Sequence, residues 1–185
     1  MTALYAAIAV VVVLLLAVGM SYNRFVSQRN LIRDSWADVD TELRRRYDLI
    51  PNLVATVKGY AAHEKEILER VTETRAAAVA ATGSPDQQAQ AEAPLVGALR
   101  GLLAVAENYP QLKASENFLS LQKELSNTED RLQAARRFYN ANVRDYNRRV
   151  QSFPSNIIAG WFNFREEKFF EVEEAVRVAP QVDVR

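Results

Sequence analysis

Residues 3–20 read ALYAAIAVVVVLLLAVGM, an uncharged run of apolar side chains close to the N-terminus. As an α-helix this run rises roughly 27 Å, close to the hydrocarbon thickness of a bilayer. A cleaved signal peptide would carry a basic segment before a shorter apolar stretch, and no Lys or Arg precedes this run. Residues 17–19 match a cleavage site only weakly. The sequence therefore predicts a membrane-spanning anchor in residues 1–21, with residues 3–20 in the lipid bilayer.

Basic residues follow the apolar run, at Arg24, Arg29 and Arg33. The positive-inside rule places such residues on the cytoplasmic side of the membrane. We therefore expect a single-pass protein of the cell (inner) membrane, with its C-terminal part in the cytoplasm.

The composition of the 185-residue chain excludes several kinds of chemistry. There is no cysteine, which rules out disulfides, thiolate nucleophiles, zinc–thiolate sites and a lipidated cysteine anchor. Lys and Arg total 23, and so do Asp and Glu, so no net charge attracts nucleic acid. The length suits an anchor and one domain of ordinary size.

Apolar residues after the anchor recur at helical spacing, three or four residues apart. One stripe comprises Phe25, Ile32, Trp36, Val39, Leu43 and Ile50, and a second comprises Leu53, Val54, Val57, Ala61, Leu68 and Val71. Pro51 stands between them, after Asp48. The proline indicates either a kink in one helix or a break at which Asp48 caps a new helix. Four helices of comparable length pack better than three, so the sequence favours the break.

Three further signals divide the rest of the chain. Ser84-Pro85-Asp86-Gln87 has the pattern of a helix N-cap, an N1 proline and a capping box. Pro110 ends the helix that follows, Ser115 caps a last long helix, and Pro154 stops it. The prediction is an all-α protein, with an N-terminal transmembrane helix and an antiparallel up-and-down four-helix bundle in residues 22–163. Residues 164–185 form a C-terminal tail, partly extended.

Several segments of the chain resemble the LemA family. The most specific is the stretch Arg45-Arg46-Tyr47-Asp48-Leu49-Ile50-Pro51-Asn52-Leu53-Val54. Others are Tyr22-Asn23, Val57-Lys58-Gly59-Tyr60-Ala61, Glu107-Asn108-Tyr109-Pro110, Glu116-Asn117-Phe118, Tyr139-Asn140, Tyr146-Asn147 and Phe153-Pro154-Ser155. The resemblance implies a bacterial-type membrane protein with an N-terminal span and a helical bundle, and it implies no reaction and no catalytic residue.

No pattern of residues indicates catalysis, a cofactor or a metal. His63 is the one histidine, whereas metalloprotease and di-iron helices need pairs of histidines with glutamates. Acidic pairs such as Glu64/Glu66 and Glu129/Asp130 are typical of solvated helix surfaces. We therefore expect no catalytic, cofactor-binding or metal-binding residues.

Two clusters favour structural roles. Arg44-Arg45-Arg46 is interpreted as a solvated basic helix end, with contact to an acidic partner as the alternative. Tyr139/Tyr146 and Asn140/Asn147 repeat at seven residues along one helix face, which indicates coiled-coil-like packing in which a buried Asn fixes register. Binding of a partner is the alternative for this seam.

An aromatic segment follows the last long helix and includes Trp161, Phe162 and Phe164. It is too short to span a bilayer. These side chains either close the end of the bundle or contact the membrane surface or a partner, because a helix that returns towards the anchor would bring them to the interface.

The sequence thus predicts a non-enzymatic, membrane-tethered scaffold that binds other proteins. The alternative is a self-associating structural protein, a homo-oligomer that organises or shapes membrane. Ala3 and Ala7 lie four residues apart in the span, a weak signal for helix packing.

Overall fold

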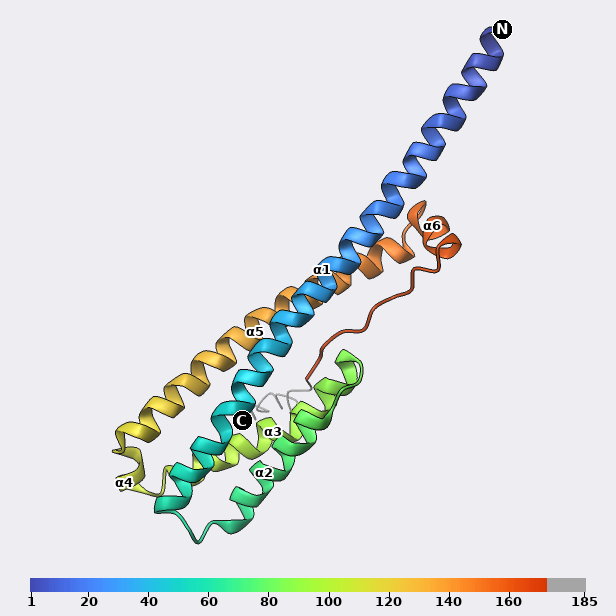
Figure 1. Cartoon of the computed structure of the whole chain (residues 1–185). Coiled ribbons are helices and arrows are strands. Elements are labelled where there is room, and N and C mark those ends of the chain that lie inside the picture. Colours follow the sequence, from blue (N-terminus) through green and yellow to red (C-terminus); the bar gives the residue numbers. More distant parts are fainter. Residues whose placement is uncertain (173–185) are drawn as a thin grey trace, which may run out of the picture. The chain divides into compact units, whose positions relative to one another are not determined.

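The computed structural model describes residues 1–172, and in that part of the chain every regular element is an α-helix (Figure 1). The helices are α1 (Thr2–Tyr60), α2 (Lys65–Ala80), α3 (Pro85–Ala106), α4 (Pro110–Lys113), α5 (Glu116–Gln151) and α6 (Ser155–Trp161). The predicted all-α class is confirmed. Of the predicted tail, residues 164–172 are non-helical, and the remainder lies outside the described residues.

The chain divides into two compact units, and both long helices contribute to each. Unit 1 comprises residues 1–40 and 133–169, and unit 2 comprises residues 41–132 and, of the described chain, residues 170–172. The division falls within α1 and within α5, so a single helix carries both the apolar N-terminal run and part of unit 2.

In unit 1 the first part of α1 and the last part of α5 run antiparallel. The ring of Trp36 lies 5.3 Å from that of Tyr139, and the ring of Phe25 lies 6.0 Å from that of Tyr146. Moving towards the N-terminus of α1 thus moves towards the C-terminus of α5. Phe25 and Ile32 of the first predicted stripe are buried in this core, with Tyr139 and Tyr146 of the heptad repeat and with Val143. The sequence placed the end of the last long helix at Pro154, whereas α5 ends at Gln151, and Phe153, after that end, is exposed.

In unit 2 successive helices also pair in antiparallel fashion. Arg75 of α2 bonds to the carbonyl of Tyr47 in α1, and Gln88 of α3 bonds to the carbonyl of Ala78 in α2. The Ile67 side chain of α2 packs over Gly101 of α3, where an added Cβ would lie 2.9 Å from the Cδ1 atom of Ile67. A larger residue at position 101 would therefore displace the Ile67 side chain.

The predicted break at Asp48 is wrong. Helix α1 continues through Pro51 to Tyr60, and the chain turns at residues 61–64 instead. Pro51 has no N–H to donate to the carbonyl of Tyr47, four residues before it. Arg75 Nε donates to that carbonyl at 2.7 Å, so the acceptor left by the proline is satisfied from α2 and the helix persists.

The predicted starts of two later helices are confirmed, whereas Pro110 begins the short α4 after α3 has ended at Ala106. Helix α3 begins at Pro85, with the Ser84 amide donating to Gln87 Oε1 at 3.0 Å, and α5 begins at Glu116 after Ser115. Pro94 stays within α3, which is continuous across it.

Candidate membrane-facing and interaction sites

The apolar N-terminal run is the first candidate site. Among residues 1–172, α1 is the single helix long and apolar enough to cross a membrane, and its apolar stretch has no packing partner in unit 1. Every residue from Met1 to Ala17 is exposed, including a continuous series of valines and leucines. A surface of this length and composition in water would be strongly unfavourable, which fits burial in lipid.

A cluster of aromatic rings begins two residues after this run. We call Tyr22, Phe25, Phe162 and Phe164 the membrane-proximal cluster. The Tyr22 ring lies 4.8 Å from that of Phe162, and the Phe25 ring stacks on that of Phe164 at 4.7 Å. These contacts join the segment after α6 to α1 at the end of the apolar run.

The turn that ends α6 brings Phe164 back onto α1. Asn163 has a φ of 54°, and the Phe164 amide donates to the Ala159 carbonyl at 2.9 Å. This is the hydrogen bond of a Schellman-type helix end, in which Asn is one of the few residues that tolerate the left-handed conformation. The reversal aims the Phe164 side chain inward while α6 stays at the surface.

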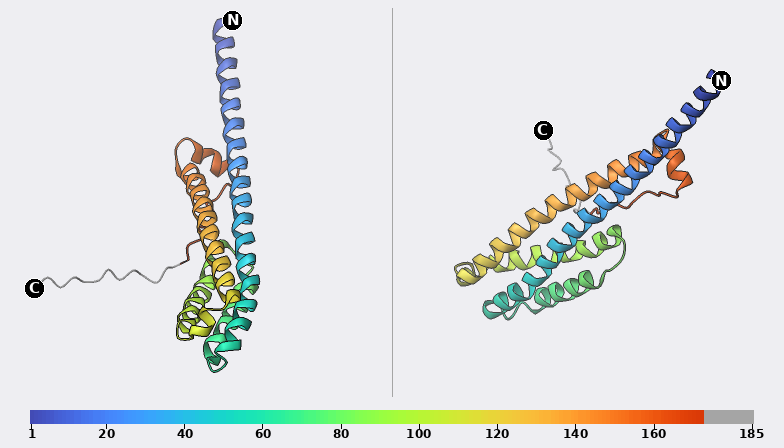
Figure 2. Two further views of the ribbon diagram at one scale, coloured as in Figure 1. Left: turned by 90° about the vertical axis from the view of Figure 1, so that its left-hand side faces the viewer. Right: turned by 45° about the horizontal axis from the view of Figure 1, so that its top comes forward.

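The three aromatic residues singled out in the sequence have different environments. Phe164 is 7% exposed and packs in the core of unit 1, whereas Trp161 is 71% exposed and Phe162 is 48% exposed. Helix α6 lies beside α1 in both views of Figure 2. Trp161 and Phe162 are therefore the residues of this group that are available to an external surface.

The C-terminal strap, residues 163–169, is held by the Tyr/Asn seam of α5. The Asn147 side-chain amide donates to the Glu167 carbonyl and accepts from the Glu167 amide, each at 2.9 Å. The Tyr139 hydroxyl donates to the Lys168 carbonyl at 2.7 Å. The seam thus bonds to the chain's own C-terminal segment, a role that its heptad spacing did not reveal.

Charged groups surround the membrane-proximal cluster. Burial lowers the pKa of Arg149, and the neighbouring charge of Arg24 lowers it further. Arg29 Nε lies 3.8 Å from Glu167 Oε1, and because both side chains are substantially exposed this pair adds little stability. The end of unit 1 nearest the apolar run therefore holds several arginines close together.

Unit 2 contains a buried polar network centred on Arg46. Arg46 is 1% exposed, and its guanidinium donates to Glu92 and, at 3.0 Å, to Glu129 Oε1. Glu92 also accepts from the Tyr47 hydroxyl and, at 3.1 Å, from Gln88 Nε2. The network joins α1, α3 and α5, and it occupies a position where the sequence predicted a solvated basic cluster.

The interpretation of Arg46 as part of a solvated helix end is therefore wrong, whereas Arg44 and Arg45 are exposed as expected. A signal for Arg46 exists in the sequence. It lies three residues after Leu43 and four before Ile50, in phase with the buried stripe, and Glu92 is likewise three residues before Leu95. Charged residues in phase with an apolar stripe indicate a buried pair.

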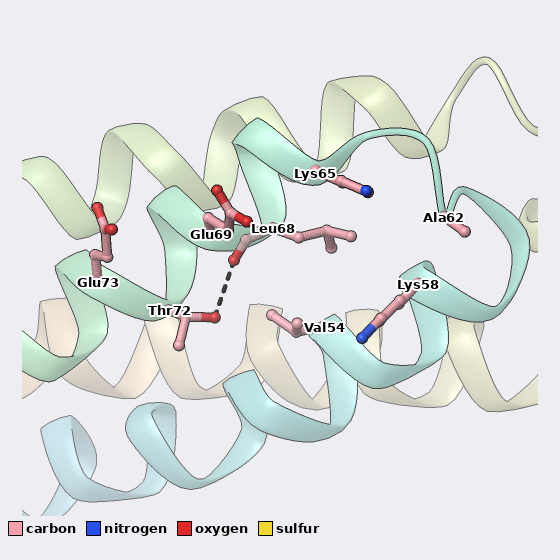
Figure 3. Close-up of a pocket in the computed structure, with 8 residues that line it drawn as sticks. All are labelled: Val54, Lys58, Ala62, Lys65, Leu68, Glu69, Thr72 and Glu73. Atoms are coloured by element: carbon pink, nitrogen blue, oxygen red, sulfur yellow. Dashed lines mark hydrogen bonds between the residues drawn. The ribbon is translucent and has the colours of Figure 1, made fainter.

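A groove lies between the end of α1 and the start of α2, with a cavity volume of about 440 Å³ (Figure 3). Its lining residues are Val54, Lys58, Ala62, Lys65, Leu68, Glu69, Thr72 and Glu73. Figure 3 shows Val54 and Leu68 facing one another across it, with Lys58 and Lys65 towards one end. An apolar floor with a charged rim is typical of surfaces that bind a helix or peptide.

Metal binding is the remaining chemistry to consider for residues 1–172. No group of three His, Asp or Glu side chains there is arranged to hold a metal ion. His63 is exposed in the turn after α1. Glu64 accepts from the Tyr109 hydroxyl at 3.0 Å, which fastens this turn to the end of α3.

Comparison with known proteins identifies related chains. The model of the LemA family matches residues 35–184. Protein LemA of Metamycoplasma hominis is 26% identical over 176 residues, covering 89% of this chain and 78% of the relative. Magnetosome proteins MamQ 1 and MamQ 2 of Paramagnetospirillum magneticum are each 25% identical over 181 residues, covering 84% of this chain. The present chain spans 66% of the length of each MamQ protein.

Proposed function

Because the chain belongs to the LemA family and begins with an exposed apolar helix, we propose that it is a membrane-tethered, non-enzymatic scaffold for other proteins. One observation carries this proposal. Helix α1 is uninterrupted from Thr2 to Tyr60, so the membrane-spanning residues and one side of the partner-binding groove belong to the same helix.

The proposed arrangement is a single pass through the cell (inner) membrane, with an antiparallel four-helix bundle on the cytoplasmic side. The pairwise antiparallel contacts within each unit support the bundle. Arg24, Arg29 and Arg33 support the orientation, because basic residues next to a span are retained in the cytoplasm.

The groove between α1 and α2 is the proposed binding surface. Val54 and Leu68 supply apolar contact, while Lys58, Lys65 and Glu69 supply charges of both signs at the rim. This combination suits an amphipathic helix, whose apolar face fills the floor and whose polar flanks meet the rim.

The test is cross-linking and co-purification of the full-length chain in mild detergent, with two matched variants. Thr72→Arg places a bulky cation in the groove, and Val79→Arg places one on an exposed position of the same helix outside it. The scaffold reading predicts co-purified proteins that Thr72→Arg loses and Val79→Arg keeps. Equal loss, or equal retention, would contradict it.

Self-association is the second candidate. It is favoured by Ala3 and Ala7, both exposed and four residues apart, which lie on one face of the span and permit close helix approach. Native mass of the same detergent preparation separates the two functions. A large particle containing this chain alone, which Ala3→Leu/Ala7→Leu dissociates, would support self-association over scaffolding.

A further inference from the structure

Helix α6 carries an apolar face with no cover in unit 1. Ile157 and Trp161 are four residues apart and share one side of the helix, where they are 44% and 71% exposed. Ala159, on the opposite side, is 2% exposed and faces the unit. Phe153, just before α6, and Phe162, just after it, are exposed too, so four large apolar side chains gather at this end of unit 1.

The residues that follow this face lie beside the end of the apolar run. Phe162 pairs with Tyr22, and Phe164 contacts both Tyr22 and Phe25. Helix α6 ends at Trp161, directly before Phe162. Tyr22 itself lies two residues after Met20, or about 3 Å along the helix axis.

From this juxtaposition we propose that α6 is a second membrane contact, which lies in the interfacial layer of the same bilayer that α1 spans. The inference rests on the proposed membrane tether and adds a surface to it. Trp at 161 suits that layer, because its ring is apolar and its indole N–H can bond to headgroups or water. Amphipathic helices with exposed aromatic residues bind at this depth.

The charges at this end fit a lipid surface. Arg24 follows the span, and Arg149 lies in the last turn of α5. Burial lowers the pKa of Arg149, and the positive charge of the nearby Arg24 lowers it further. Anionic headgroups would offset this repulsion. A bilayer is therefore favoured over an uncharged protein surface as the occupant of the α6 face.

Binding of α6 to lipid would limit the movement of unit 1 relative to the membrane. The strap after α6 is fixed to α5 by Asn147 and Tyr139, so a lipid-bound α6 would hold unit 1 to the membrane at a second point beside α1. Two fixed points would restrict the rotation of unit 1 about the axis of the span.

The chain has two tryptophans, at positions 36 and 161, which permits a direct test. The full-length protein is placed, one copy per particle, in nanodiscs of phospholipid brominated near the headgroup end of the acyl chains. Trp36→Phe leaves Trp161 as the sole emitter, and Trp161→Phe leaves Trp36. Because Trp36 lies sixteen residues beyond Met20, about 24 Å along α1, it serves as the control.

The proposal predicts loss of most of the Trp161 emission on bromination and little change for Trp36. If Trp161 is quenched no more than Trp36 while the protein remains in the nanodisc, the α6 proposal is overturned and the tether stands. If the protein does not enter nanodiscs at all, the tether itself fails. If Trp161 is protected from quenching by bromine only when two copies of the protein share a particle, the proposal is also overturned, because the α6 face would then be covered by the second copy.

A second measurement keeps both tryptophans, so it still tests the proposal if the tryptophan variants fail to fold. Since the chain has no cysteine, Ile157→Cys and Leu31→Cys each give one site for a nitroxide, and the two native side chains are equally exposed at 44%. The label at 157 should collide more with membrane-dissolved oxygen, and the label at 31 with a water-soluble nickel complex. Equal collision profiles at the two sites would contradict the α6 contact.

Discussion

The two units of this chain have interiors of different chemistry, although they share α1 and α5. Unit 1 is filled by aromatic rings, and its strap is held by neutral hydrogen bonds from Asn147 and Tyr139. Unit 2 has an apolar core, mostly of aliphatic residues, that is interrupted by the ion pair between Arg46 and Glu92. The polar bonds of unit 1 fix a segment of chain, whereas those of unit 2 join three helices.

This difference determines how much stability each unit loses when one member of a hydrogen bond or ion pair is removed. A neutral bond that is lost costs the desolvation of one polar group, whereas a buried charge without its counter-ion is far more costly. A buried ion pair adds little net stability over apolar residues of the same size. Unit 2 should therefore be sensitive to single substitutions and tolerant of paired ones.

The largest effect is expected for Arg46→Met. It leaves the Glu92 carboxylate buried without its cation, so the free energy of unfolding should fall by about 3–5 kcal/mol, measured by chemical denaturation in detergent. The control is Arg45→Met, because that guanidinium is exposed and pairs with Glu42 at 3.7 Å. The control should change stability by less than about 0.5 kcal/mol.

The paired change Arg46→Met/Glu92→Leu sharpens the comparison. With both charges gone, most of the loss caused by Arg46→Met should be recovered. A double variant as unstable as the single one would show that the ion pair itself, and not the orphaned carboxylate, carries the stability of unit 2.

Asn147→Ala should have a smaller effect, in unit 1. It removes both bonds to the backbone of Glu167, and a loss of about 1–3 kcal/mol is expected. Limited proteolysis should then cut within residues 163–169, while cuts in α2 and α3 stay slow. Gln151→Ala, which removes an exposed bond to Glu166, is the control and should leave the strap protected.

Two tyrosines seven residues apart on α5 provide a finer test. The Tyr139 hydroxyl donates to Lys168, whereas the buried Tyr146 hydroxyl has no hydrogen-bond partner among the described residues. Tyr139→Phe should therefore cost about 1 kcal/mol, and Tyr146→Phe should cost nothing or stabilise the protein slightly. Equal losses in denaturation experiments would contradict the assigned bonds.

The smallest effect concerns alkaline pH. The hydrogen bond to Glu64, together with burial and the charge of Glu64, raises the pKa of Tyr109 above its usual 10.0. The folded state thus holds this proton more tightly than the unfolded state, so the contribution is complete below pH 10.0 and is lost as the pH rises through the raised pKa. Tyr109→Phe should reduce the slope with which the free energy of unfolding declines above that pH. An unchanged slope would show that the bond between Tyr109 and Glu64 does not contribute to stability.

The sequence predicted the helices and their buried faces well, because local signals define them. Helical spacing identified the buried residues Phe25, Val39 and Tyr139, and the capping box at Ser84 marked the start of α3. The error at Asp48 has a physical cause. Whether a proline breaks a helix depends on what satisfies the carbonyl four residues earlier, and here that group is Arg75, on another helix.

The candidate sites were predicted less completely, since they depend on contacts between distant residues. Trp161 and Phe162 were recognised from composition, but the folding of Phe164 onto Phe25 required the turn at Asn163. The bond between Asn147 and Glu167 has no local signal, because one amide fixes a backbone twenty residues away. Arg46, in contrast, could have been recognised from its phase with Leu43 and Ile50.

The central claim is that α1 crosses the membrane once and holds both units on the cytoplasmic side, and site-specific labelling in cells tests it most directly. In a chain without cysteine, Thr2→Cys and Val79→Cys each introduce a single thiol for a membrane-impermeant maleimide. The account predicts that Cys at position 2 is labelled in intact spheroplasts and that Cys at position 79 is labelled only after permeabilisation. Labelling of position 79 in intact spheroplasts, or release of the protein from membranes by carbonate, would contradict the account.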